Sequence, residues 1–165
     1  MAIVIASPCG AWRRACPAAQ DIARAAATAA LARGAQEFAL PGQATIEIGV
    51  RLHDDAAQQR LNRDWRGADR PTNVLAFSAW EPGAPTPAGA PLLLGDVVLG
   101  FETVAREAAA QGKPLADHLS HLVVHGVLHL LGCDHVTEAE AVAMETLEMK
   151  ILASLGVPDP YRGTI

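Results

Sequence analysis

An apolar stretch at residues 115–131 constrains the fold most strongly, because it carries histidines and ends at Gly132. Its apolar residues occur all round the helical repeat, which predicts a buried central helix. His125 and His129 are four residues apart, so their side chains lie on one helix face, one turn apart. Glycine after the last apolar turn can adopt the left-handed conformation that ends a helix and reverses the chain. We therefore expect His135 to turn back toward the two histidines.

Three histidines in this arrangement predict a metal centre. Imidazole nitrogens are zinc ligands, and three protein ligands with a fourth position open to water are typical of a catalytic zinc. We predict one zinc ion bound by His125, His129 and His135. Cys133 is the alternative third ligand, since a thiolate in the same turn also binds zinc; Gly132 favours His135 because it supplies the turn.

The histidine spacing equals that of the metzincin peptidases, H-E-x-x-H-x-x-G-x-x-H. Where those peptidases have the glutamate that acts as general base, this chain has Gly126, which cannot take up a proton. Metal-bound water in a partly dry pocket can still become a nucleophile at neutral pH. A metallopeptidase or another zinc hydrolase therefore remains an alternative, in which the base comes from elsewhere or is not needed.

The residues around the histidines are similar to a known family. Residues 125–135, HGVLHLLGCDH, resemble the H-G-x-L-H-L-x-G-Y-D-H signature of the YbeY family, bacterial zinc-dependent endoribonucleases of rRNA maturation. Residues 61–77 resemble its L-N-x-x-[YW]-R-G-x-D-x-P-T-[DN]-V-L-S-F block, and residues 94–98 its L-G-D-[IV]-[VI] block. Cys133 stands where the family usually has tyrosine, and the first 40 residues contribute little to the likeness.

The resemblance implies that Arg66, the arginine of the R-G-x-D block, is needed for activity. A guanidinium beside a zinc site can bind a phosphodiester with two parallel hydrogen bonds and stabilise the extra negative charge of the transition state. The structural alternative is a surface ion pair with Asp69. Without the resemblance, Arg63 and Arg70 are equally good candidates.

The resemblance also implies a function: single-strand-specific endoribonuclease activity in small-subunit rRNA 3′-end maturation and ribosome quality control. The expected partners are single-stranded RNA, chiefly rRNA, and ribosomal or ribosome-assembly proteins, with neither a membrane nor DNA among them. A non-enzymatic ribosome-assembly factor with a structural zinc is a second alternative.

Composition alone does not suggest RNA, because the net charge is −5. Five arginines do fall within twenty residues, interleaved with four aspartates, so a solvated mixed-charge face explains them equally well. The arginines are at positions 51, 60, 63, 66 and 70.

Length and composition predict a single domain over residues 1–165, since half of the residues are hydrophobic. The longest apolar runs are well short of the roughly 18 residues of a transmembrane helix, and no basic residue precedes the first apolar run as in a secretory signal. Three cysteines without CxxC spacing suit a reducing compartment. We expect a cytoplasmic protein.

The predicted fold is α+β, a small mixed sheet of about four strands packed with helices, whose central helix carries the histidines. Apolar alternation and β-prone runs predict strands at 3–6, 45–52, 73–78 and 92–100; helical signals predict helices at 18–33, after Asp54, at 101–111, 115–131 and after Thr137. The alanine-rich helix is expected to stop at Gly34, and the helix after Asp54 to carry Leu61 and Trp65 inward. The proline-rich segment 82–91 is expected to be a surface loop.

Four further residues are secondary candidates. His118 and His121 precede His125 by seven and four residues, and we expect them to be supporting or surface residues rather than ligands. Asp134 could orient a ligand imidazole or cap the turn. Asp96 is expected to face water rather than the metal.

Overall fold

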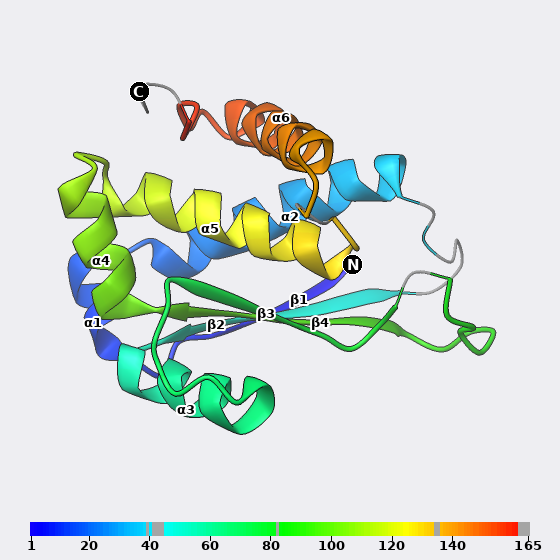
Figure 1. Cartoon of the computed structure of the whole chain (residues 1–165), viewed down its shortest axis with the longest axis horizontal. Helices are drawn as coiled ribbons and strands as arrows, with labels where there is room; N and C mark the ends of the chain where they lie inside the picture. The colour runs from blue at the N-terminus through cyan, green and yellow to red at the C-terminus, as the bar shows by residue number, and fades with distance from the viewer. Residues whose placement is uncertain (39, 41–44, 82, 134–135, 162–165) are drawn as a thin grey trace.

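The structure is a computed structural model that describes residues 1–38, 40, 45–81, 83–133 and 136–161. It confirms the predicted α+β class, with a four-stranded mixed sheet and helices on both of its faces (Figure 1). The elements in chain order are β1 (Ala2–Ala6), α1 (Gly10–Ala15), α2 (Ala19–Glu37), β2 (Ile46–His53), α3 (Asp55–Arg66), β3 (Val74–Ser78), β4 (Leu92–Gly100), α4 (Phe101–Ala110), α5 (Leu115–Leu130) and α6 (Glu138–Ser154).

The strand order is β1-β2-β4-β3, with β1, β2 and β4 parallel and β3 antiparallel to β4. The alternation predicted for β2 is confirmed, because Ile48, Val50 and Leu52 are all buried. In β4, a strand with a neighbour on either side, Leu94 and the run from Val97 to Leu99 are fully buried, as expected for an interior strand.

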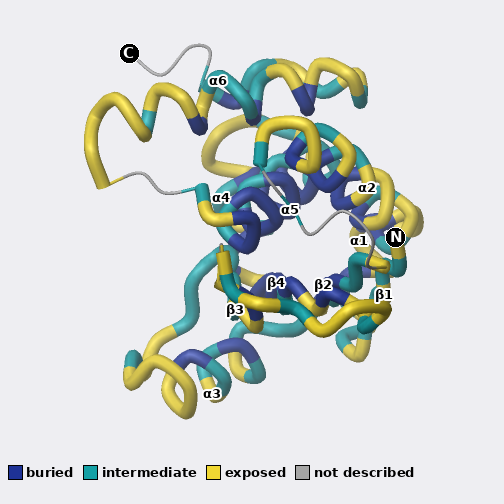
Figure 2. The backbone as a smooth tube through the Cα atoms, turned by 90° about the vertical axis from the view of Figure 1, so that its right-hand side faces the viewer, coloured by how far each residue is buried: buried dark blue, intermediate teal, exposed yellow. Residues whose placement is uncertain are grey.

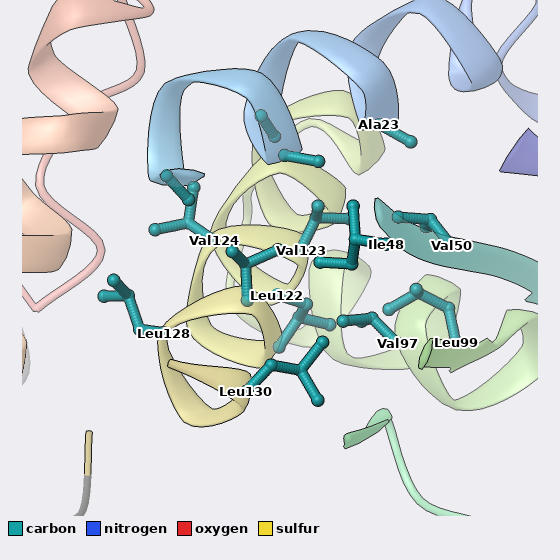
Figure 3. Close-up of a cluster of buried hydrophobic side chains, with 14 of the residues drawn as sticks. Ala23, Ile48, Val50, Val97, Leu99, Leu122, Val123, Val124, Leu128 and Leu130 are labelled. Carbon is teal, nitrogen blue, oxygen red and sulfur yellow. The ribbon is translucent and has the colours of Figure 1, made fainter. Parts of the chain in front are cut away.

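Helix α5 lies between the sheet and the outer helix α6, as both views show (Figures 1 and 2). Its apolar residues contact α2 on one side and the sheet on the other; Figure 3 shows Val123 and Val124 among residues of both. The alanines of α2 at positions 23, 26, 27 and 30 are fully buried and let the two helices approach closely. Helix α5 is therefore the predicted central helix. On the other face of the sheet, α3 is the one labelled helix that lies below the strands in Figure 2.

The prediction that Gly34 ends the alanine-rich helix is wrong, since α2 continues to Glu37. Gly34 is buried, and a Cβ atom placed on it would lie 2.2 Å from Leu131 Cδ1. Glycine serves here to admit a neighbouring side chain, at a position within the helix rather than beyond its end.

The prediction that Trp65 faces inward is also wrong: its side chain is 76% exposed, and Leu61 is half-buried. The buried residues of α3 are the polar Gln58 and Asn62. Gln58 Nε2 donates to Val98 O at 3.0 Å, and Asn62 Nδ2 donates to Arg70 O at 2.9 Å. Helix α3 is therefore held to the sheet and to its own following loop by amide hydrogen bonds, which hydrophobic periodicity does not detect.

The predicted starts of α3 and α6 are confirmed. Asp54 Oδ1 accepts from Ala57 N at 2.7 Å at the start of α3, and Thr137 Oγ1 accepts from Glu140 N at 3.1 Å at the start of α6. Gly67 ends α3 in the left-handed conformation, with φ of 71°. No helix in the described part of the chain is both long enough and apolar enough to cross a bilayer.

Candidate functional site

A cavity of about 500 Å³ opens where α5, β3, the end of α3 and the C-terminal segment meet. Its lining includes Arg66, Ala76, His121, His125, His129 and Tyr161. The structure therefore brings two of the predicted metal ligands and the predicted catalytic arginine, which are about sixty residues apart in the sequence, to one hollow.

His125 and His129 face each other inside this cavity. Their Nε2 atoms are 3.1 Å apart, and their rings meet edge to face with centroids 4.6 Å apart. A tetrahedral zinc with Zn–N bonds of about 2.0–2.1 Å would place two ligand nitrogens about 3.3 Å from each other. The two imidazoles thus fit one metal ion without a change of helix geometry.

His135 and Asp134, the predicted third ligand and its neighbour, lie outside the described residues. The turn that leads to them is described: Gly132 has a φ of 99°, and its N–H donates to His129 O at 3.0 Å. The predicted reversal after α5 is therefore confirmed as far as Cys133. Within the described ranges, no group of three or more His, Cys, Asp or Glu side chains is arranged to hold a metal ion.

Sequence reasoning missed Glu148, a fully buried carboxylate on α6 beside the cavity. Its Oε1 accepts a hydrogen bond from His125 Nδ1, and its Oε2 accepts one from the Tyr161 hydroxyl. His121 Nε2 lies 3.4 Å from the same Oε2. The sequence does contain an indication of this role: Glu148 follows Met144 by four residues, which places a carboxylate on the buried, otherwise apolar face of α6.

The hydrogen bonds around Glu148 decide its charge. Burial by itself would raise the pKa of this carboxyl, but hydrogen bonds from His121 and His125, the charge of His125 and the Tyr161 hydroxyl lower the pKa to about 2. Burial and the adjacent carboxylate raise the pKa of Tyr161, so that its hydroxyl stays protonated. Glu148 is therefore an anion at neutral pH and Tyr161 a hydrogen-bond donor.

Arg66 lies on the opposite wall of the cavity from α5, where β3 holds it in place. One of its terminal nitrogens donates to Ala76 O, and its guanidinium carbon lies 5.1 Å from the centre of the Phe77 ring. The alternative partner Asp69 instead accepts from Gln59 Nε2 at 3.0 Å. Arg63, the rival candidate, is paired with Asp64 at 3.2 Å.

Packing against the sheet explains why residue 126 is a glycine. A Cβ atom at this position would lie 2.6 Å from Val97 Cγ1, because α5 passes very close to β4. A glutamate at the position of the metzincin base would meet the sheet, so the absence of that base is built into the packing of this fold.

Of the remaining candidates, His118, Asp96 and Cys133 lie outside the cavity lining, and His121 lies within it. His118 is buried and 2.9 Å from Glu107 Oε1, and burial chiefly lowers its pKa. Asp96 is 3.7 Å from Arg51, on the sheet face opposite to that of Val97 and α5, as predicted. Cys133 borders a different hollow beside Phe38, Met144 and Leu147, and burial followed by the charge of Glu148 raises its pKa to about 11. The cavity therefore holds His121 beside the two facing histidines, with its Nε2 directed to Glu148 and Tyr161.

Comparison with known proteins agrees with this geometry. The family model for endoribonuclease YbeY matches residues 15–156. The endoribonuclease YbeY of Paramagnetospirillum magneticum is 56% identical over 160 residues, which cover 96% of this chain and 94% of that protein. That of Rhodospirillum rubrum is 51% identical over 154 residues, covering 92% of this chain and 77% of the relative.

The fold is also found among solved structures. The solution structure of TM1509 from Thermotoga maritima superimposes with a TM-score of 0.60 over 93% of this chain and 91% of that chain, at 19% sequence identity. This likeness concerns the fold, whereas the family match includes Arg66 and the cavity histidines of α5. The chain therefore belongs to the endoribonuclease YbeY family.

Proposed function

We propose that this chain is a zinc-dependent endoribonuclease that cleaves single-stranded RNA in the cytoplasm, in small-subunit rRNA 3′-end maturation and ribosome quality control. The observation that carries the proposal is the pair of facing Nε2 atoms of His125 and His129, 3.1 Å apart, in a cavity that Arg66 also lines. Family membership supplies the reaction class, a hydrolytic cleavage of RNA.

In this proposal, each residue of the site has a separate role. His125, His129 and His135 would hold the zinc ion, which supplies a Lewis acid beside the scissile phosphate and makes water a stronger acid. Arg66, held by Ala76 O, has further N–H donors with which to bind a phosphate oxygen and stabilise negative charge as it develops. Gly126 leaves no side-chain base on α5, so activation of water would depend on the metal.

Single-strand specificity is supported by the surface beside Arg66. Trp65 precedes it on α3 and is 76% exposed, which is unusual for so large an apolar side chain. Unpaired bases stack on exposed aromatic rings, whereas the bases of a duplex are already stacked on each other. Trp65 and Arg66 together could therefore bind a base and a phosphate of one flexible strand.

The acidic chain gives weak general attraction to RNA, since its net charge is −5. Part of the cationic surface near the cavity is already neutralised, as in the Arg63–Asp64 pair. Ribosomal or ribosome-assembly proteins, as binding partners, would supply the missing affinity by holding the enzyme close to its rRNA substrate.

The test is cleavage of a labelled single-stranded RNA, compared with the same sequence as a duplex and as single-stranded DNA. Zinc-loaded protein should cleave the single-stranded RNA, and protein stripped with a chelator should not until zinc is restored. His125→Ala should lose zinc binding and cleavage together. Full cleavage by metal-free protein, or equal cleavage of the duplex, would contradict the proposal. Hydrolysis of an unstructured protein substrate instead of RNA would favour a metallopeptidase.

A further inference from the structure

Glu148 contacts the candidate metal site through Nδ1 of His125. It is 0% exposed on α6, and both of its oxygens are engaged: Oε1 by His125 Nδ1, and Oε2 by the Tyr161 hydroxyl, with His121 Nε2 at 3.4 Å. Burial of a carboxylate is costly unless hydrogen bonds replace its lost water. The neighbouring buried residues of α6, Met144 and Ile151, are apolar, so this one carboxylate stands out on an otherwise apolar face.

The bond to His125 decides which ring nitrogen carries the proton. Oε2 of Glu148 accepts from the Tyr161 hydroxyl, and Oε1 lies against Nδ1 of His125, so the carboxyl group is the acceptor for both neighbours and Nδ1 of His125 is the donor. In the neutral ring the lone pair is then on Nε2, the atom that faces His129 at 3.1 Å. This is the tautomer that a metal ligand requires, and its orientation is fixed by the same bond.

We propose that Glu148 is the positioning residue of this site: its carboxylate holds His125 in the Nδ1–H tautomer, aims Nε2 at the metal position and anchors Tyr161 to the cavity wall. The inference rests on the proposed function, because it gives Glu148 its role through a zinc ligand. Glu148 acts through its contacts with His125 and Tyr161.

Loss of such a carboxylate lowers metal affinity about 10- to 100-fold in known metal sites. Glu148→Ala removes the acceptor of His125 Nδ1 and should raise the zinc Kd by about that factor. Glu148→Gln keeps the shape and one carbonyl oxygen for His125, but turns an amide NH2 group toward Tyr161 and His121. Its loss of affinity should therefore be smaller than that of Glu148→Ala.

The chain offers a matched control in Glu107. This carboxylate lies 2.9 Å from Nε2 of His118, another histidine of α5, which borders a separate, smaller hollow. Glu107→Gln alters a carboxylate–histidine bond of the same kind, and it should leave the zinc Kd unchanged. Zinc Kd is measured by competition with a chromogenic chelator, alongside the melting temperature of each zinc-free variant. A merely structural role for Glu148 would lower the melting temperature and leave the zinc Kd at its wild-type value.

A second measurement needs no variant. Nitrogen-15 NMR of the zinc-free wild-type protein should show His125 with its proton on Nδ1. A proton on Nε2, or a wild-type zinc Kd in folded Glu148→Ala, would overturn the inference while the proposed function stands, provided the wild type binds zinc and cleaves RNA. Wild-type protein that binds no zinc at this site would instead overturn the proposed function.

Discussion

The Nε2 atoms of His125 and His129 lie 3.1 Å apart across one turn of α5, in a cavity whose opposite wall holds Arg66. Four-residue spacing on a helix places the two imidazoles on one face. The bond from His125 Nδ1 to Glu148 then turns Nε2 toward His129. A cation-binding position beside a phosphate-binding side chain results from this packing.

Arg66→Glu should lower RNA cleavage about 100- to 1000-fold, the cost of losing a preorganised donor to transition-state charge. Zinc content should stay at the wild-type level, because Arg66 is anchored to Ala76 and not to the histidines. The control is Arg63→Glu, which reverses a charge on the same helix at a residue already paired with Asp64. It should lower RNA cleavage far less. Rate constants at saturating RNA measure both, and equal losses would remove the special role of Arg66.

Trp65→Ala should weaken binding of single-stranded RNA by about 5- to 150-fold, since stacking of one base contributes about 1–3 kcal/mol. The free energy of unfolding should hardly change, because the ring is 76% exposed. Leu93→Ala, which removes another exposed apolar side chain on β4, is the control for RNA binding. Fluorescence anisotropy with a labelled oligonucleotide gives both affinities; unchanged binding by Trp65→Ala would exclude the stacking role.

Gly126→Ala should lower the free energy of unfolding by about 1–3 kcal/mol, because the added methyl group would overlap Val97 Cγ1 at 2.6 Å. Chemical denaturation measures this cost. In a Val97→Ala background the space is available, and the same substitution should cost much less. If the two substitutions change the free energy of unfolding additively, contact with Val97 is not the reason that residue 126 is a glycine.

Stability should fall as the pH drops below about 6.5. Burial chiefly lowers the pKa of His118 and of His53 from the ordinary value of 6.5. The unfolded chain therefore binds these protons more readily than the folded chain, so the stabilisation is complete above pH 6.5 and is lost as the pH falls. In His118→Gln the free energy of unfolding, measured by denaturation between about pH 7.5 and 5.5, should depend less on pH. A slope identical to that of the wild type would contradict the assignment to His118.

The elements with strong periodicity or strong capping residues were predictable from the sequence. The alternation in β2, the Asp54 cap and the turn at Gly132 each depend on neighbours in the chain, and each is present. The helix that carries His125 and His129 was predictable for the same reason, and so was the placement of both imidazoles on one of its faces.

The errors occur where contacts between distant segments decide the outcome. Gly34 remains inside α2 because Leu131 occupies the space beside it, and Trp65 is exposed because amide side chains hold α3 instead. Helix α1 was missed because its six residues bury one large side chain, Trp12, whose Nε1 donates to His53 O at 2.9 Å. Glu148 was missed because its histidine partners are on another helix.

The most direct test of the account is the zinc content of purified protein, measured together for the wild type and for single alanine variants of His125, His129 and His135, with Cys133→Ser as the control. The account predicts one zinc per wild-type chain and per Cys133→Ser chain, and loss of zinc with loss of RNA cleavage in each histidine variant. Full zinc content in His135→Ala, or a wild-type chain that cleaves RNA without binding zinc, would contradict it.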